Sequence, residues 1–374
     1  MDTELTEDQE LLREMSARLI EDRCPIATVR ALGDDERGVS TEYLKQTGEL
    51  GWYALLVSEA HGGGQVSASG VSDAAVVAEE RGRWVQPGPF VPTNLVALAL
   101  SEFGSDAQRA ALLPGLLAGE AVASWAVADA DGCWEAGAGV RVTGSGPSVV
   151  LDGVKGMVQD AHIANTLLVT AQGAAGPVHL LVPRDAPGVV VEPLSSLDIT
   201  RRFFRVRFGQ VELPADAVVG TPADAARLYD RLLEVAAVLT VAESVGGIGE
   251  LADLTVAYAK ERFAFGRPIG SFQAIKHNLA DTALRLEMCR AISTAATRAV
   301  ASRETFAGEV ASMAKSFVGG HAVEISHDCF QVIGGIAYTW EHDQHLYFRR
   351  LATDALLYGD PAWHRERICA LHGL

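Results

Sequence analysis

The feature that most constrains the fold is the hydrophobic period, which changes twice along the chain. Apolar residues recur at near-helical spacing over about residues 4–120. Short β-type runs separated by Gly, Pro and Asp follow over about 121–220, and the helical period returns from about 223 to 372. We therefore expect three domains: an N-terminal helical domain (1–120), a central β domain (121–220) and a C-terminal helical bundle (221–374).

The runs within the last two regions refine this prediction. The β-type runs, among them 167–171, 178–182 and 204–208, follow one another closely and predict a small antiparallel sandwich or barrel. The C-terminal helical runs extend for about 25 residues or more, which is long for a globular helix and typical of a four-helix bundle. The predicted fold class is α+β.

The composition excludes several classes of function. The 374 residues include 31 Lys and Arg against 48 Asp and Glu, and the net charge of −17 argues against nucleic-acid binding, which needs clustered cations. The chain starts with acidic residues, unlike a signal peptide, and we identify no charge-free apolar run of 18 residues that could span a membrane. Five scattered cysteines without a C-x-x-C pattern indicate reduced thiols and no metal site. These features predict a soluble, cytoplasmic protein.

Two C-terminal segments carry the strongest motifs. In residues 258–281, Arg262 and Arg267 flank a Gly-Arg-Pro-Ile-Gly turn, where a fixed guanidinium could bind a phosphate. In residues 331–350, the pair Gly334-Gly335 would permit the close approach of a ligand to the backbone. Spacing alone leaves an alternative open, which is an ordinary helical hairpin with solvated arginines.

Taken together, these segments resemble the acyl-CoA dehydrogenase family, and the resemblance covers nearly the whole chain. Residues 51–64 are similar to the family's "GW.gl..Pe.yGG" segment, with Ser58 in place of the proline. Residues 262–266 followed by Gln273 are similar to "R..FG...fQ". Residues 331–335 are similar to "Q..GG.Gy", with Ala337 in place of the third glycine.

The resemblance implies an FAD-dependent oxidoreductase that acts on acyl-CoA thioesters. In the family, a carboxylate removes the α-proton while the β-hydrogen leaves as hydride to FAD, and electron-transfer flavoprotein accepts the electrons. Each FAD lies between two subunits. The residues of this chain that would reach the FAD of a neighbouring subunit are Arg262, Phe265, Gln273, Gln331, Gly334 and Gly335.

The sequence departs from the family at the base. The family's "YEGT" glutamate aligns with Tyr358, and a phenol of pKa about 10 is only roughly 0.1% ionised at pH 7. The second known base position aligns with Ala236. Glu243 lies near the same helix face and is the alternative candidate, although a packed structural carboxylate fits the same pattern.

The residues that hold a flavin ring in the family are also missing here. The "TEP.aGSD" segment aligns with residues 125–133, which contain neither the proline nor Gly-Ser-Asp. Met157 and Gln159 stand at the aromatic and hydroxyl positions of the following strand, and Ala237 replaces an arginine that helps to bind CoA.

These departures, with the ending at residues 358–367, resemble the base-lacking subunit of actinobacterial α2β2 acyl-CoA dehydrogenases, several of which act on steroid-CoA side chains. We therefore expect this chain to complete the FAD site of a partner subunit that carries the catalytic Glu. Two alternatives stay open. One is a self-sufficient homotetramer that uses Glu243, Asp360 or another group as its base, and the other is a flavin-free structural homologue.

Overall fold

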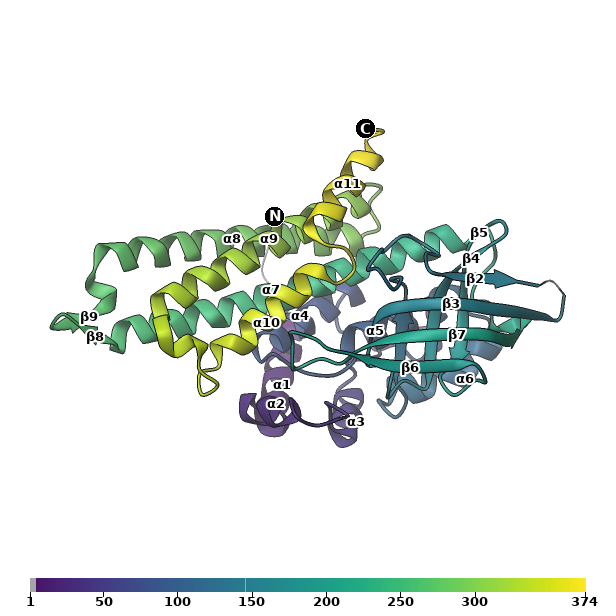
Figure 1. Ribbon diagram of the computed structural model, residues 1–374, viewed down its shortest axis with the longest axis horizontal. Coiled ribbons are helices and arrows are strands. Elements are labelled where there is room, and N and C mark those ends of the chain that lie inside the picture. Colours follow the sequence, from purple (N-terminus) through teal and green to yellow (C-terminus); the bar gives the residue numbers. More distant parts are fainter. Residues whose placement is uncertain (1–4, 145) are drawn as a thin grey trace.

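The N-terminal region is helical, as expected. The computed structural model describes residues 5–144 and 146–374, so part of the acidic start and one residue of the β region lie outside the described residues. Thr6 and Ser105 begin two of the helices with capping boxes, in which side chains satisfy free backbone N–H groups. The helices are α1 (Glu7–Arg23), α2 (Ile26–Leu32), α3 (Thr41–Glu49), α4 (Gly70–Arg83), α5 (Phe90–Phe103) and α6 (Asp106–Leu117) (Figure 1).

The β region forms one seven-stranded mixed sheet in the order β1-β4-β2-β3-β7-β6, with β5 paired to β4. The expectation that the strands of this region are antiparallel is corrected, since β1 pairs with β4 in parallel. Parallel neighbours need a long connection, and here that connection contains β2 and β3. The strands are β1 (Ala123–Ala126), β2 (Val140–Thr143), β3 (Ser148–Gln159), β4 (Thr166–Gly173), β5 (Gly176–Pro183), β6 (Val189–Leu194) and β7 (Phe203–Pro214).

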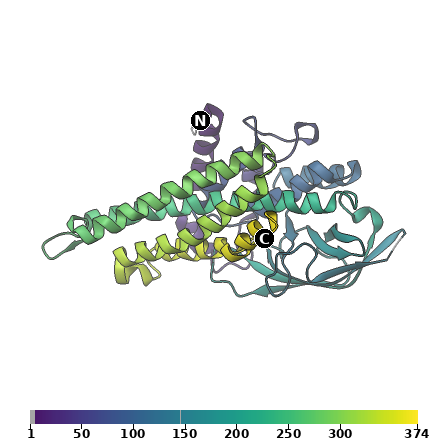
Figure 2. The ribbon, with the colours of Figure 1, turned by 90° about the horizontal axis from the view of Figure 1, so that it is seen from above.

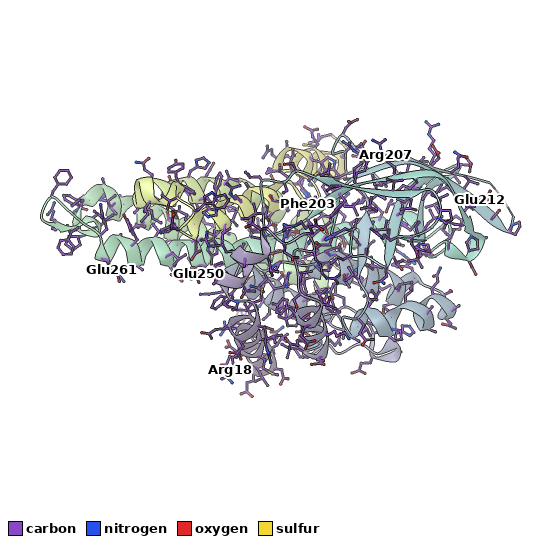
Figure 3. The ribbon with its side chains drawn as sticks, turned by 60° about the horizontal axis from the view of Figure 1, so that its bottom comes forward. Arg18, Phe203, Arg207, Glu212, Glu250 and Glu261 are labelled. Atoms are coloured by element: carbon purple, nitrogen blue, oxygen red, sulfur yellow. The ribbon has the colours of Figure 1, made fainter. Side chains whose placement is uncertain are left out.

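The C-terminal region is a bundle of long helices, and the α+β fold class is confirmed. In Figures 1 and 2 the longest helices lie side by side, with the sheet at one end of the molecule and the small hairpin of β8 (Phe263–Ala264) and β9 (Arg267–Pro268) at the other. Figure 3 shows Glu261 beside this hairpin, and Arg207 and Glu212 at the opposite end. The helices are α7 (Ala225–Glu261), α8 (Gln273–Ala301), α9 (Ala307–Ile333), α10 (Gln344–Leu356) and α11 (Pro361–Leu371).

Helix α7 is the centre of the core. By length and composition it is apolar enough to cross a membrane, but 94% of its most apolar segment is buried inside the protein. It crosses α4 at very close range, because a Cβ on Gly246 would lie 1.9 Å from the Glu79 carbonyl oxygen. These observations identify α7 as a core helix of a folded domain.

Candidate functional site

The β8–β9 hairpin presents the first group of predicted site residues. Phe265 and Gly266 both have positive φ, 52° and 79°, so they form a tight two-residue turn between the paired Ala264 and Arg267. The Phe265 ring is 95% exposed and meets Phe272 edge to face at 6.2 Å. A large apolar side chain held this far out in solvent is typical of a binding surface.

Two polar side chains flank this hairpin. Arg262 follows the last residue of α7 and is exposed, and no carboxylate of residues 5–144 or 146–374 lies within ion-pair distance of its guanidinium. Arg267, in contrast, lies with its guanidinium carbon 4.0 Å above the Phe272 ring. Gln273, in the first turn of α8, is exposed and lies 3.2 Å from His277. Both arginines are exposed and have no carboxylate partner within the described residues, and Arg262 in addition makes no contact with a ring.

The connection from α9 to α10 presents the second group. Gly334 has φ 76° and ψ −149°, a conformation open only to glycine, and it ends α9. A Cβ on Gly334 or Gly335 would meet no atom within 4 Å, so the backbone faces open space. Gln331 is exposed one turn earlier. This connection lies at the same end of the bundle as the hairpin (Figures 1 and 2).

Tyr358, which by sequence aligns with the family's glutamate, is buried and does not suit the role of a base. Its ring stacks on Trp125 with centroids 6.0 Å apart and an interplanar angle of 16°, and it packs against Trp134 at 5.4 Å. Burial raises the pKa of the phenol well above its ordinary value, so the hydroxyl stays protonated. Lys315, which donates to the Gly359 carbonyl at 3.0 Å, fixes the turn that carries Tyr358.

The two tryptophans are also fixed, and with Tyr358 they form what we call the aromatic plug (Trp125, Trp134 and Tyr358). Trp125 donates its indole N–H to the Thr170 hydroxyl at 2.8 Å, and His179 lies 3.0 Å from that hydroxyl. The free space around the plug is about 10 Å³, enough for about one water molecule. The sequence predicted that the flavin-ring donors are missing, and its signal for this filling was the pair of indoles at Trp125 and Trp134.

Glu243 lies in a buried charge network. Its two carboxylate oxygens accept from Arg201 at 2.5 Å and from Arg350 at 2.6 Å, and its side chain is 2% exposed. Burial alone would raise the pKa of Glu243, but the two guanidinium charges outweigh it and hold the pKa below its usual value. This geometry favours a structural role and does not suit a base. Asp360 likewise caps α11 by accepting from the Trp363 backbone N–H at 2.7 Å.

Comparison with known proteins defines the class. Residues 6–120 match the family model described as "Acyl-CoA dehydrogenase, N-terminal domain", and residues 227–370 match "Acyl-CoA dehydrogenase, C-terminal domain". The acyl-CoA dehydrogenase IpdE2 of Mycolicibacterium smegmatis is 30% identical over 97% of this chain and 98% of that protein. The chain belongs to the acyl-CoA dehydrogenase family.

Several solved structures are similar to this chain. A variant of the "Tcur3481-Tcur3483 steroid ACAD" is 27% identical with a TM-score of 0.89, over 98% of each chain. The "ChsE4-ChsE5 complex from Mycobacterium tuberculosis" is 24% identical with a TM-score of 0.91, over 100% of this chain and 99% of that chain, and shows the fold. A glutaryl-CoA dehydrogenase of Mycobacterium smegmatis in complex with FADH2 shares the fold, with a TM-score of 0.87 at 21% identity, over 99% and 96% of the two chains. These relatives agree with FAD as the family's cofactor and with steroid-type, heteromeric neighbours.

Proposed function

We propose that this chain is the subunit without a catalytic base in a heteromeric FAD-dependent acyl-CoA dehydrogenase. It completes the FAD site of a partner subunit that carries the catalytic Glu, and the complex introduces an α,β double bond into an acyl-CoA thioester, with a steroid or other lipid side chain as the acyl group. The observation that supports this most strongly is a contrast: the chain's own cleft is filled by the aromatic plug, whereas the bundle end is exposed and free to bind.

The chain's own cleft does not fit FAD. Ligand pockets for molecules of drug size or larger have volumes of about 300–1,000 Å³, and the space around the plug is about 10 Å³. Trp125 and Tyr358 are each no more than 5% exposed and are held by hydrogen bonds and by the turn after α10. The chain therefore offers no room for an isoalloxazine ring between its sheet and its bundle.

The bundle end fits the outer half of FAD. The free guanidinium of Arg262 suits a diphosphate, to which it can donate two parallel hydrogen bonds. Gly334 and Gly335 leave the backbone open to a ligand at close range. Phe265, Gln273 and Gln331 add an exposed ring and two amides to the same end. When bound, FAD supplies the two-electron oxidation, and the residues of this chain bind and orient it.

Exposed apolar side chains at the same end indicate a protein partner. Large patches of this kind are rare on monomers and mark interaction sites. Apolar side chains are also exposed along α8, where Leu284 is 61% and Met288 44% exposed. Further exposed members at the hairpin and at the α9–α10 connection are Phe263, Ile336, Tyr338 and Trp340. The proposal includes electron-transfer flavoprotein as the electron acceptor of the complex and the cytoplasm as its location.

The test is expression of the chain alone and together with an acyl-CoA dehydrogenase subunit that has an intact base. We expect the chain alone to retain little flavin, and the co-expressed complex to be yellow and to reduce an electron acceptor with acyl-CoA. An isolated chain that binds FAD stoichiometrically and oxidises acyl-CoA would refute the proposal. If every complex recovered from cells lacks flavin, the flavin-free structural homologue is the correct alternative.

Arg262 provides the residue-level test. Removal of a charge-assisted hydrogen bond costs about 1.5–3 kcal/mol, so Arg262→Ala should weaken FAD binding by the complex roughly 10- to 150-fold. The measurement is the FAD dissociation constant of the purified complex, followed by flavin fluorescence. The matched control is Arg207→Ala, which removes an exposed arginine paired with Glu192 on the sheet, at the opposite end of the molecule (Figure 3). Equal losses in both variants would contradict the assignment.

A further inference from the structure

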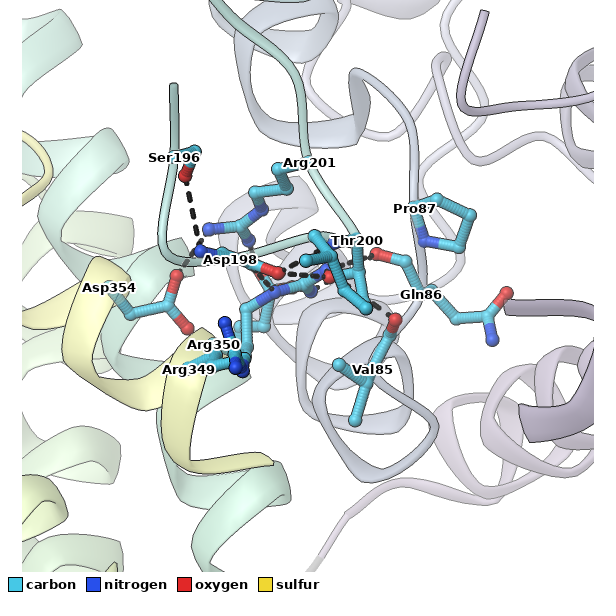
Figure 4. A network of polar contacts seen from close by, with 12 residues as sticks. Val85, Gln86, Pro87, Ser196, Asp198, Thr200, Arg201, Arg349, Arg350 and Asp354 are labelled. Atoms are coloured by element: carbon cyan, nitrogen blue, oxygen red, sulfur yellow. Dashed lines mark hydrogen bonds and ion pairs between the residues drawn. The ribbon is translucent and has the colours of Figure 1, made fainter. Parts of the chain in front are cut away.

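A buried charge cluster joins all three domains of this chain. We define it as Asp198, Arg201, Glu243, Arg350 and Asp354, and no side chain of the cluster is more than 4% exposed. Figure 4 shows Arg201 and Arg350 close to Asp198 and Asp354, and both arginines also pair with Glu243. The first two members lie between β6 and β7, Glu243 lies on α7, and the last two lie on α10.

Each arginine connects several segments. Arg201 donates to Asp354 and, at 2.5 Å, to Glu243. Arg350 donates to Glu243 at 2.6 Å, to Asp198 at 2.8 Å and to the Gln86 carbonyl at 3.0 Å. Gln86 lies between α4 and α5, so the N-terminal domain is included. These contacts tie α10 to the β6–β7 loop, to α7 and to the segment between α4 and α5.

The charges nearly balance within the core. The cluster contains two guanidinium cations and three carboxyl groups, and the buried guanidinium of Arg81 on α4 acts on Glu243 as a third cation. A buried ion whose partner is removed is left uncompensated at low dielectric, which is strongly unfavourable. Any motion that separates the β6–β7 loop from α10 would therefore break several buried pairs at once.

The same motion would open the cleft. Trp125 lies on β1 of the sheet, and Tyr358 follows α10 of the bundle, so the stacked rings span the boundary between these two parts. Asp354 lies in the last turn of α10, and Tyr358 follows two residues after the end of this helix, so a shift of α10 would move both the cluster and the plug. The charge cluster and the aromatic plug close the same boundary at two places.

We propose that the charge cluster is a clamp that keeps the chain's own cleft closed, so that the subunit holds its shape with nothing bound between its domains. That the bundle end then binds a partner's FAD as a rigid half-site rests on the proposed function. The clamp itself is a property of the isolated chain. Its test needs neither flavin nor partner, and its failure leaves the co-expression test untouched.

The experiment is amide hydrogen exchange of the full-length chain, compared with Glu243→Gln, which keeps the side-chain shape and removes the charge that both arginines share. We expect protection in residues 195–203 and 354–360 to fall by about 100-fold or more, with α8 unchanged. The control is Glu192→Gln, the same chemical change in an exposed pair with Arg207. Unchanged protection of residues 195–203 and 354–360 in Glu243→Gln would overturn the proposal of a clamp. An equal loss of protection throughout α8 would also overturn it.

A second variant covers the case in which Glu243→Gln does not fold. Arg350→Lys keeps the positive charge but loses the planar fork that reaches Glu243, Asp198 and Gln86 together. We expect a folded chain with faster exchange at the same two segments and stronger quenching of tryptophan fluorescence by acrylamide. An Arg350→Lys chain with wild-type exchange and quenching would refute the clamp as well.

Discussion

Replacement of Trp125 by alanine would test whether the plug is a built part of the core. The indole is 3% exposed, stacks on Tyr358 and donates to Thr170 at 2.8 Å. Truncation of a buried tryptophan to alanine costs about 3–5 kcal/mol through lost burial and the remaining cavity. Trp125→Phe keeps a ring but loses the hydrogen bond and part of the ring volume, so it should cost about 1–2 kcal/mol.

The expected change in melting temperature follows from chain length. An unfolding entropy of about 2.1 cal/mol/K per residue gives about 0.8 kcal/mol/K for a chain of 374 residues that melts as one unit. Trp125→Ala should therefore lower Tm by about 4–6 °C, and Trp125→Phe by about 1–3 °C. The assay is differential scanning calorimetry of the isolated chain, with urea denaturation to obtain the free energy of unfolding.

Binding of a small molecule to the variant can show whether Trp125 fills the cleft or only contributes to the stability of the fold. Free indole at saturating concentration should raise the Tm of Trp125→Ala, because a ligand that binds only the folded state stabilises it. It should leave the wild type unchanged, since only about 10 Å³ is free there. The reasoning is refuted if Trp125→Ala melts like the wild type, or if indole stabilises both proteins equally.

Three further predictions concern other parts of the structure. Burial raises the pKa of Asp354 to about 7, so the folded state holds the carboxyl proton more tightly than the unfolded state does. The contribution of Asp354 to the free energy of unfolding should therefore decline from about pH 4 to pH 7. Asp354→Asn should flatten that part of a plot of the free energy of unfolding against pH. Gly335→Ala should leave the Tm of the chain unchanged, since its Cβ meets no atom within 4 Å, but should lower the flavin content of the complex. Gly246→Ala should strongly destabilise the chain in thermal denaturation, because its Cβ would lie 1.9 Å from a backbone oxygen of α4, and a wild-type Tm would contradict this packing.

Local sequence patterns were sufficient for several features. The period of the apolar residues predicted the helical, β and helical regions. The Gly-Arg-Pro-Ile-Gly segment predicted a turn, but the structure puts the tight turn one residue earlier, at Phe265 and Gly266. The prediction that the base position is vacant depended on Tyr358 and Ala236. Sheet topology could not be predicted in the same way, because strand pairing such as that of β1 with β4 joins segments that are far apart in the chain.

The sequence by itself determined the family and the α+β class, and it predicted the absence of the family's glutamate, because each of these depends on contiguous motifs or on the local period. Only the tertiary structure decided what fills the cleft and what role suits Glu243. The plug joins residues of β1 to the turn after α10, and Arg350 reaches Asp198 across 152 positions of the chain. Side chains so distant in sequence leave no periodic signal. Their pairing depends on how the helices and the sheet pack. The sequence predicted only that the flavin-ring donors are missing, whereas the packing shows a cleft filled by the aromatic plug beside the buried charge cluster.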